Sequence, residues 1–93
     1  MLTDPERTHL DATVITPSFN SVETVERCIK SVAAQTILPS EHIIVDDGSS
    51  DGTRDLLFKL AGIYPWLKII VQPNRGAASA RNAGIEEARG KIV

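Results

Sequence analysis

Short apolar runs along the chain alternate with stretches in which apolar residues recur every three or four positions. The runs predict strands covered on both faces, and they lie at residues 12–16 (ATVIT), 43–45 (IIV), 68–71 (KIIV) and 91–93 (KIV). Helical spacing predicts amphipathic helices over residues 22–35, between Asp51 and Gly62, and over residues 77–89. Strands and helices therefore alternate along the chain.

Polar residues and glycines mark the expected helix ends. Asn20 or Ser21 is expected to cap the first helix, and Asn20 with Glu23 resembles a capping box. Asp51 is expected to cap the second helix, and Gly90 fits a cap at the end of the third. Two further features concern packing. Pro39 predicts a break before the second strand, and small residues four apart predict a flat face on the third helix: Ala80, Gly84 and Ala88.

The order β-α-β-α-β-α-β predicts an α/β fold. Such alternation favours a Rossmann-like parallel sheet with right-handed crossovers and helices on both faces. The 93 residues suffice for one small domain, which we place at residues 12–93. Residues 1–11 are polar and without periodicity, so they are expected to form a flexible lead-in.

The amino-acid composition limits the kinds of binding partner and the compartment that we expect for this chain. Hydrophobic residues make up 42% and charged residues 24%, as in ordinary globular proteins. The net charge of −2, without a basic block, predicts no nucleic-acid or anionic-membrane partner. The lone cysteine, Cys28, excludes an internal disulfide and suggests a reducing compartment. We therefore expect a cytoplasmic protein, or one on the cytoplasmic face of a membrane if an anchor lies downstream.

Chemically versatile residues follow each of the first three predicted strands. Pro17 to Asn20 follow the first strand, Asp46 and Asp47 the second, and Gln72 to Gly76 the third. In open α/β sheets, ligands bind at the carboxyl ends of the strands. An aromatic ring, carboxylates, amides and a cation are therefore expected to gather at one edge of the sheet.

The segment DDGSSDG after the second strand allows several interpretations. An ordinary turn is one, since Asp, Gly and Ser favour turns. A calcium loop is excluded, because Phe58 stands where an EF-hand needs a bidentate Glu. A phosphoacceptor pocket like that of receiver domains is disfavoured, because no Asp follows Asp55. Nucleotide recognition remains, since a carboxylate can accept a hydrogen bond from a base N–H, although phosphate-binding glycine motifs are absent.

Three segments carry a family likeness: VITPSFNSVETVERCIKSVAAQT, IIVDDGSSDGT and NRGAASARNAGIEEARGKIV. Together they closely resemble the amino-terminal half of family-two inverting glycosyltransferases of the GT-A fold. The resemblance implies transfer of a sugar from a nucleotide-diphosphate sugar to a saccharide or lipid-linked acceptor hydroxyl, with inversion. UDP is the expected nucleotide, with dTDP and GDP left open. Two alternatives stay open: a non-catalytic nucleotide-binding module and a receiver-like signalling domain.

The resemblance also implies roles for individual residues. Phe19 would stack on the base, Asp47 would hydrogen-bond the base or the ribose edge, and Arg81 would lie near the diphosphate or base. Alternatively, Phe19 covers the core and Arg81 is a solvated helix residue. Asp46 lies on the opposite pleat face from Asp47, and we expect it to hold the turn. The expected nucleotide-binding set is Pro17, Phe19, Asn20, Asp46, Asp47 and Arg81, with Ser18, Gly48 and Arg75 as further candidates.

Catalytic and metal-binding residues are expected outside this chain. The resemblance implies a divalent cation, Mg²⁺ or Mn²⁺, held by an Asp-x-Asp motif after the fourth strand, and a general base further on. Glu86 and Glu87 do not substitute, because adjacent helix residues point about 100° apart. We therefore expect a donor-nucleotide part that is inactive alone. An exposed sheet edge or helix face is expected to make it a homo-oligomer.

Overall fold

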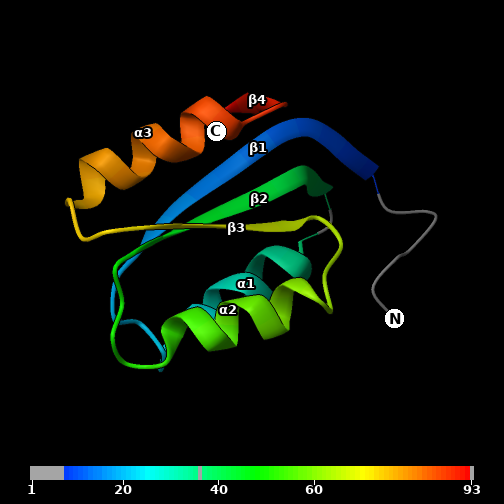
Figure 1. Ribbon diagram of the computed structural model, residues 1–93. Coiled ribbons are helices and arrows are strands. Elements are labelled where there is room, and N and C mark those ends of the chain that lie inside the picture. Colours follow the sequence, from blue (N-terminus) through cyan, green and yellow to red (C-terminus); the bar gives the residue numbers. More distant parts are fainter. Residues whose placement is uncertain (1–7, 36, 93) are drawn as a thin grey trace.

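A computed structural model of the protein describes residues 8–35 and 37–92 (Figure 1). Strands and helices alternate along the described chain, as the sequence predicts. The elements are β1 (Thr8–Ser18), α1 (Val25–Ala33), β2 (Ile37–Asp47), α2 (Thr53–Ala61), β3 (Leu67–Gln72), α3 (Ala77–Glu87) and β4 (Lys91–Ile92).

The strands form one parallel sheet with the order β3-β2-β1-β4. Helices α1 and α2 lie on one side of the sheet and α3 lies on the other (Figure 1). The predicted α/β fold with helices on both faces is confirmed. Strand β2 lies between β1 and β3, so both its edges are hydrogen-bonded.

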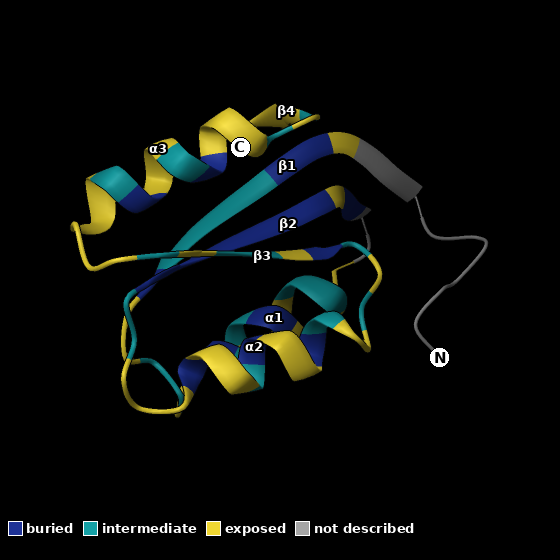
Figure 2. Ribbon diagram, in the orientation of Figure 1, coloured by how far each residue is buried: buried dark blue, intermediate teal, exposed yellow. Residues whose placement is uncertain are grey.

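Two apolar layers hold the sheet between the helices. The layer under α1 and α2 contains Val25, Ile29, Ile44, Leu57, Leu60 and Leu67. The layer under α3 contains Ile43, Val45 and Ala80. Because successive strand residues point to opposite faces, β2 supplies apolar side chains to both layers, and Figure 2 shows it buried along most of its length. This explains the consecutive apolar positions 43–45.

The small residues of α3 let that helix approach the sheet closely. Ala80 is fully buried, and Gly84 is buried against β1. A Cβ added at Gly84 would lie 2.5 Å from Cγ2 of Ile15, which is closer than real carbon atoms approach. The predicted small-residue face is therefore confirmed for Ala80 and Gly84, whereas Ala88 lies just past the end of the helix.

The first two strands are longer than predicted. The sequence predicts that residues 8–11 belong to a flexible lead-in, but they form part of β1, where residues 8–10 pair with residues 37–39 of β2. Pro39 lies inside β2 and does not break it. Its partner is Leu10, beside an irregularity in the register between Leu10 and Thr13. A proline cannot donate to the ladder and is tolerated at such irregular positions. Residues 1–7 of the expected lead-in lie outside the described residues.

The predicted start of the first helix is wrong. Helix α1 begins at Val25, after a turn in which the backbone N–H groups of Thr24 and Val25 donate to the carbonyl of Ser21. Asn20 forms no capping box, because its side chain accepts a hydrogen bond from the β2–α2 loop. Asp51 accepts a hydrogen bond from the backbone N–H of Thr53, although Gly52 occupies the N-cap position of α2.

The predicted end of the third helix is also wrong. Helix α3 ends at Glu87, and Ala88 is extended, with φ −67° and ψ 138°. The next backbone N–H groups do not continue the helix. That of Arg89 donates to Glu41, and that of Gly90 donates to Thr13. Because these N–H groups bond to the strand residues Glu41 and Thr13, the helix ends before Gly90, and Gly90 does not cap it.

The far edge of the described sheet is formed by β4, whose Lys91 and Ile92 are exposed; Val93, assigned to the same strand, lies outside the described residues. Homo-oligomerisation through such an edge stays a prediction. No helix within residues 8–35 and 37–92 is long and apolar enough to cross a membrane.

Candidate functional site

The loops that follow β1, β2 and β3 lie side by side at the carboxyl ends of the strands. Ser18 at the end of β1 pairs with Asp46, and Asp47 at the end of β2 pairs with Gln72 at the end of β3. The parallel register therefore brings the three loops together. This confirms the convergence that the sequence predicts.

Hydrogen bonds fasten the β1–α1 loop to the β2–α2 loop. The backbone N–H of Asn20 donates to Oγ of Ser49 (2.9 Å), and the backbone N–H of Ser50 donates to Oδ1 of Asn20 (2.8 Å). Asn20 has a φ of 46°, a left-handed conformation that asparagine tolerates better than most residues. A third bond runs from the backbone N–H of Ser21 to Oγ1 of Thr53 (2.9 Å). The two loops thus form one connected rim.

Phe19 lies on this rim, one residue beyond the pair formed by Ser18 and Asp46. The residue is 52% exposed, so about half of its surface is open to solvent. The backbone on both sides of Phe19 is held in place, because Ser18 is buried in β1 and Asn20 is hydrogen-bonded to the neighbouring loop. Pro17, also a predicted site residue, is half-buried and pairs with Val45.

Asp46 is fully buried beneath the β2–α2 turn. Its Oδ2 accepts a hydrogen bond from the backbone N–H of Ser49 (3.2 Å) and lies 3.6 Å from Nε of Arg54. Its Oδ1 has no hydrogen-bond partner among the described residues. The contact with Ser49 is the turn-holding role expected from its pleat face.

Asp47 points to the opposite face and accepts hydrogen bonds from the β3–α3 loop. Its Oδ1 accepts from Nε2 of Gln72 (2.8 Å) and from the backbone N–H of Arg75 (2.8 Å). Its Oδ2 accepts from the backbone N–H of Gly76 (2.9 Å) and from Nδ2 of Asn74 (3.3 Å). The bond from the Gln72 side chain, followed by that from the Arg75 backbone, lowers the pKa of Asp47. The carboxylate is therefore ionised near neutral pH.

Gly48 lets the β3–α3 loop pack directly on the end of β2. Its φ is 76°, and a Cβ added there would lie 2.7 Å from the backbone nitrogen of Asn74. A side chain at this position would push the loop away and would strain the backbone. The sequence placed Gly48 among the further site candidates, and the structure gives it this packing role.

The two candidate arginines lie on different flanks of α3. Arg75 is exposed and borders a cleft of about 410 Å³, which is lined by Gln72, Arg75, Ser79, Asn82, Ala83 and Glu86. Arg81 is exposed and follows the buried Ala80, and helical geometry places it on the flank away from that cleft. Whether either arginine contacts a nucleotide stays a prediction.

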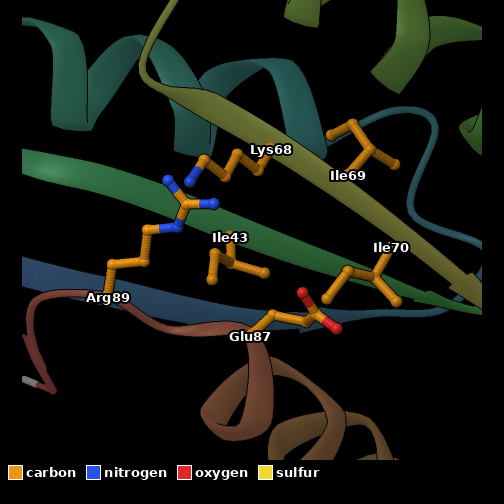
Figure 3. A pocket seen from close by; sticks show the side chains of 6 residues that line it. All are labelled: Ile43, Lys68, Ile69, Ile70, Glu87 and Arg89. Carbon is orange, nitrogen blue, oxygen red and sulfur yellow. The ribbon is translucent and has the colours of Figure 1, made fainter.

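A second groove of about 410 Å³ lies on the α3 face of the sheet, beside β3. It is lined by Ile43, Lys68, Ile69, Ile70, Glu87 and Arg89. Figure 3 shows the side chains of Lys68 and Arg89 extending toward each other above Ile43. Lys68 lies near the start of β3, so this groove is separate from the rim formed at the ends of the strands.

Sequence reasoning missed Glu41, a charged residue inside β2. Only 3% exposed, it accepts hydrogen bonds from Oγ1 of Thr13 (2.7 Å), the backbone N–H of Arg89 (2.5 Å) and Nζ of Lys68 (2.6 Å). Burial raises its pKa, but the bonds from Arg89, Lys68 and Thr13 outweigh burial and lower the pKa to about 2. The available signal was its spacing of two and four residues from Ile43 and Val45, which places it on a buried face.

His42 is also fully buried, on the face that α1 and α2 cover. Its Nε2 hydrogen-bonds Oγ1 of Thr16 (2.8 Å), and its ring stacks on Trp66 at 6.3 Å between centroids. Burial lowers its pKa to about 4, so the ring is neutral at physiological pH. These contacts give His42 a structural role in the sheet.

The described residues do not fit a divalent cation. Within residues 8–35 and 37–92, no group of three or more His, Cys, Asp or Glu side chains could hold a metal ion. The adjacent carboxylates of Asp46 and Asp47 do not form a pair, since they point to opposite faces and the Asp47 oxygens are occupied by loop donors.

Comparisons with known proteins identify the family to which the chain belongs. The pattern of the family described as "Glycosyl transferase family 2" matches residues 13–93. The cholesterol galactosyltransferase of Borreliella burgdorferi is 41% identical over 80 residues, which are 86% of this chain and 22% of that protein. The chain belongs to glycosyl transferase family 2, which confirms the resemblance.

Solved structures agree with this assignment. The structure of Staphylococcus aureus TarS 1–349 matches with a TM-score of 0.75 and 29% identity, over 88% of this chain and 26% of that one. The mannosyltransferase PcManGT from Pyrobaculum calidifontis, in complex with GDP-Man and Mn²⁺, matches with a TM-score of 0.73 and 26% identity, over 96% and 27%. The chain thus has the GT-A fold and spans about a quarter of the length of these proteins.

Proposed function

We propose that residues 12–93 form the donor-nucleotide part of a glycosyltransferase. The observation that carries the proposal is the connected rim at the ends of β1 and β2, which holds the exposed ring of Phe19 one residue beyond the pair formed by Ser18 and Asp46. Family membership supports the same conclusion. The intact enzyme would transfer a sugar from a nucleotide-diphosphate sugar to an acceptor hydroxyl, with inversion.

The residues at the rim have the chemistry that a nucleotide needs. An exposed aromatic ring offers a flat π face on which a base stacks. The ionised carboxylate of Asp47 accepts a hydrogen bond from a base that presents a ring N–H, as uracil, thymine and guanine do. Arg81 and Arg75 are the candidates for neutralising the diphosphate. UDP is the nucleotide that we propose, although PcManGT was solved with GDP-Man.

The cation and the general base are proposed to come from elsewhere in the intact enzyme. PcManGT was solved with Mn²⁺, and a divalent cation stabilises the negative charge on a departing nucleoside diphosphate. Since the described residues offer no fitting group, we expect the 93-residue chain to bind nucleotide weakly and to transfer no sugar. Turnover of a UDP-sugar by the purified chain would contradict this expectation.

Titration of the chain with UDP, dTDP and GDP tests the proposal, with backbone amide NMR as the readout. We expect UDP to shift the signals of Phe19, Asp47 and Arg81 together. A matched pair of variants then isolates stacking, because Phe19 and Phe58 are 52% and 54% exposed and Phe58 lies on α2. F19A should weaken UDP binding about tenfold, within the range for base–aromatic stacking. F58A should leave binding unchanged, and equal affinities for the two variants would overturn the proposal.

A further inference from the structure

The carboxylate of Asp47 has no acceptor position left for a ligand. An ionised carboxylate offers about four lone-pair positions. All are used by the β3–α3 loop: Gln72 and Arg75 donate to Oδ1, and Asn74 and Gly76 donate to Oδ2. The residue is only 3% exposed. A base N–H can therefore reach Asp47 only by replacing one of these donors.

The donors differ in how easily they can be replaced. The backbone N–H groups of Arg75 and Gly76 lie immediately before α3, and the carbonyl of Gly76, the N-cap residue, accepts from the N–H of Ala80 (3.1 Å). Moving them would disturb the helix. The side-chain amide of Gln72 is half-buried and can rotate into water, whereas that of Asn74 also donates to the backbone carbonyl of Asp47 (2.9 Å), so it can give up its contact with the carboxylate without leaving Asp47. The Asn74 contact, at 3.3 Å, is also longer than the usual N–H···O bond.

We infer that the carboxylate of Asp47 exchanges a hydrogen-bond donor of the β3–α3 loop for one from a bound nucleotide. We call this contact between Asp47 and the loop the latch. In the free protein its carboxylate holds the side-chain amides of Gln72 and Asn74. When a base binds, its N–H takes the place of one of these amides, while the backbone donors of Arg75 and Gly76 stay. The inference rests on the proposed function, and it makes the loop conformation depend on nucleotide occupancy.

The exchange at Asp47 should also affect the cleft beside α3. Gln72 also lines the cleft beside α3. Release of its amide from Asp47 would therefore change the polar lining of that cleft. Asn74 packs on Gly48, and its side-chain Nδ2 donates a second hydrogen bond to the backbone carbonyl of Asp47 (2.9 Å), so the side chain stays bound to Asp47 when its contact with the carboxylate is lost.

The first experiment needs no nucleotide. Hydrogen exchange is measured for the backbone amides of Arg75 and Gly76 in the wild-type chain and in D47N. Arg75 and Gly76 donate to different oxygens of Asp47, and an asparagine has only one acceptor oxygen, so protection of at least one of the two amides should fall about tenfold or more, as expected for a lost charge-assisted hydrogen bond. Protection of Ile44, in the centre of β2, should stay the same. Unchanged protection of Arg75 and Gly76 would overturn the latch.

The second experiment uses UDP. Removing a competing donor should help the ligand, so Q72A should bind UDP about threefold to tenfold more tightly, the range of one net hydrogen bond. Q35A is the matched control, because Gln35 is exposed just after α1 and should not affect binding. Unchanged or weaker binding by Q72A would overturn the exchange while leaving the proposed function standing.

The wild-type chain provides a measurement that no folding defect can obscure. Saturating UDP should shift the side-chain NH₂ signal of Gln72 or Asn74, while the backbone amides of Arg75 and Gly76 stay protected. UDP binding without either shift would overturn the exchange. Absence of UDP binding would overturn the proposed function and the exchange together, and the D47N measurement would still report on the contact with the loop.

Discussion

Glu41 and Asp47 are equally buried carboxylates on the same strand, yet they serve different regions of the molecule. Both are 3% exposed, and their spacing places both on the α3 face of β2. Glu41 lies within the sheet and joins β1, β3 and the segment after α3. Asp47 lies at the end of the strand and bonds the loop that begins at the end of β3. Position along a strand thus decides whether a buried carboxylate supports the fold or a loop.

The largest expected effect is that of removing Glu41. E41A leaves the buried hydroxyl of Thr13 and the backbone N–H of Arg89 without their acceptor, at about 1–3 kcal/mol for each unsatisfied donor, so it should lower the free energy of unfolding by about 3–5 kcal/mol. D47A should cost only about 1 kcal/mol, because the freed loop donors can bind water. Urea unfolding measures both values. A cost for D47A as large as that for E41A would contradict the distinction.

Lowering the pH should distinguish the contributions that His42 and Glu41, on opposite faces of β2, make to the free energy of unfolding. Burial holds the pKa of His42 at about 4, below its ordinary 6.5, so the unfolded chain takes up a proton in this window that the folded chain does not. The free energy of unfolding should therefore fall by up to about 3 kcal/mol as the pH drops from 6.5 to 4. The pKa of Glu41 is lowered to about 2, so its contribution is complete above pH 4.5 and is lost toward pH 2.

Urea midpoints at pH 7, 5.5 and 4 test this assignment. The variant H42N carries no titrating ring, so its midpoint should change less over this range than that of the wild type. Equal pH dependence in the two proteins would show that other groups cause the loss.

Glycine substitutions test how closely the β3–α3 loop packs on β2. Gly48 and Gly52 both have a positive φ, but only a Cβ at Gly48 would collide with backbone, that of Asn74. G48A should destabilise the chain by about 2–3 kcal/mol and G52A by about 1 kcal/mol, the difference being the collision. Thermal unfolding compares them, and the amide signals of Arg75 and Gly76 should shift only in G48A. Equal costs would contradict the close packing of the loop.

The smallest expected effect is that of Lys68. Its side chain is 45% exposed, so solvent screens its bond to Glu41. K68A should lower the free energy of unfolding by less than about 1 kcal/mol. A loss comparable to that of E41A would show that the ion pair, and not the bonds from Thr13 and Arg89, accounts for the role of Glu41.

The sequence alone determined the architecture and most of the candidate site. Consecutive apolar residues at 43–45 predicted a strand buried on both faces, and the alternation of strands with helices predicted the parallel sheet. The order of the elements predicted that the loops after the first three strands meet at the ends of those strands. These features could be predicted because they depend on local periodicity and on the rule that parallel strands end at one edge.

Only the tertiary structure decided how the carboxylates are used and where the elements end. Glu41 bonds residues 28 and 48 positions away, and Asp47 bonds Gly76, 29 positions away. Such contacts end α3 at Glu87, while the pairing of residues 8–10 with residues 37–39 extends β1. Local pattern does not report them, because a hydrogen bond between distant residues depends on the three-dimensional path of the chain between them.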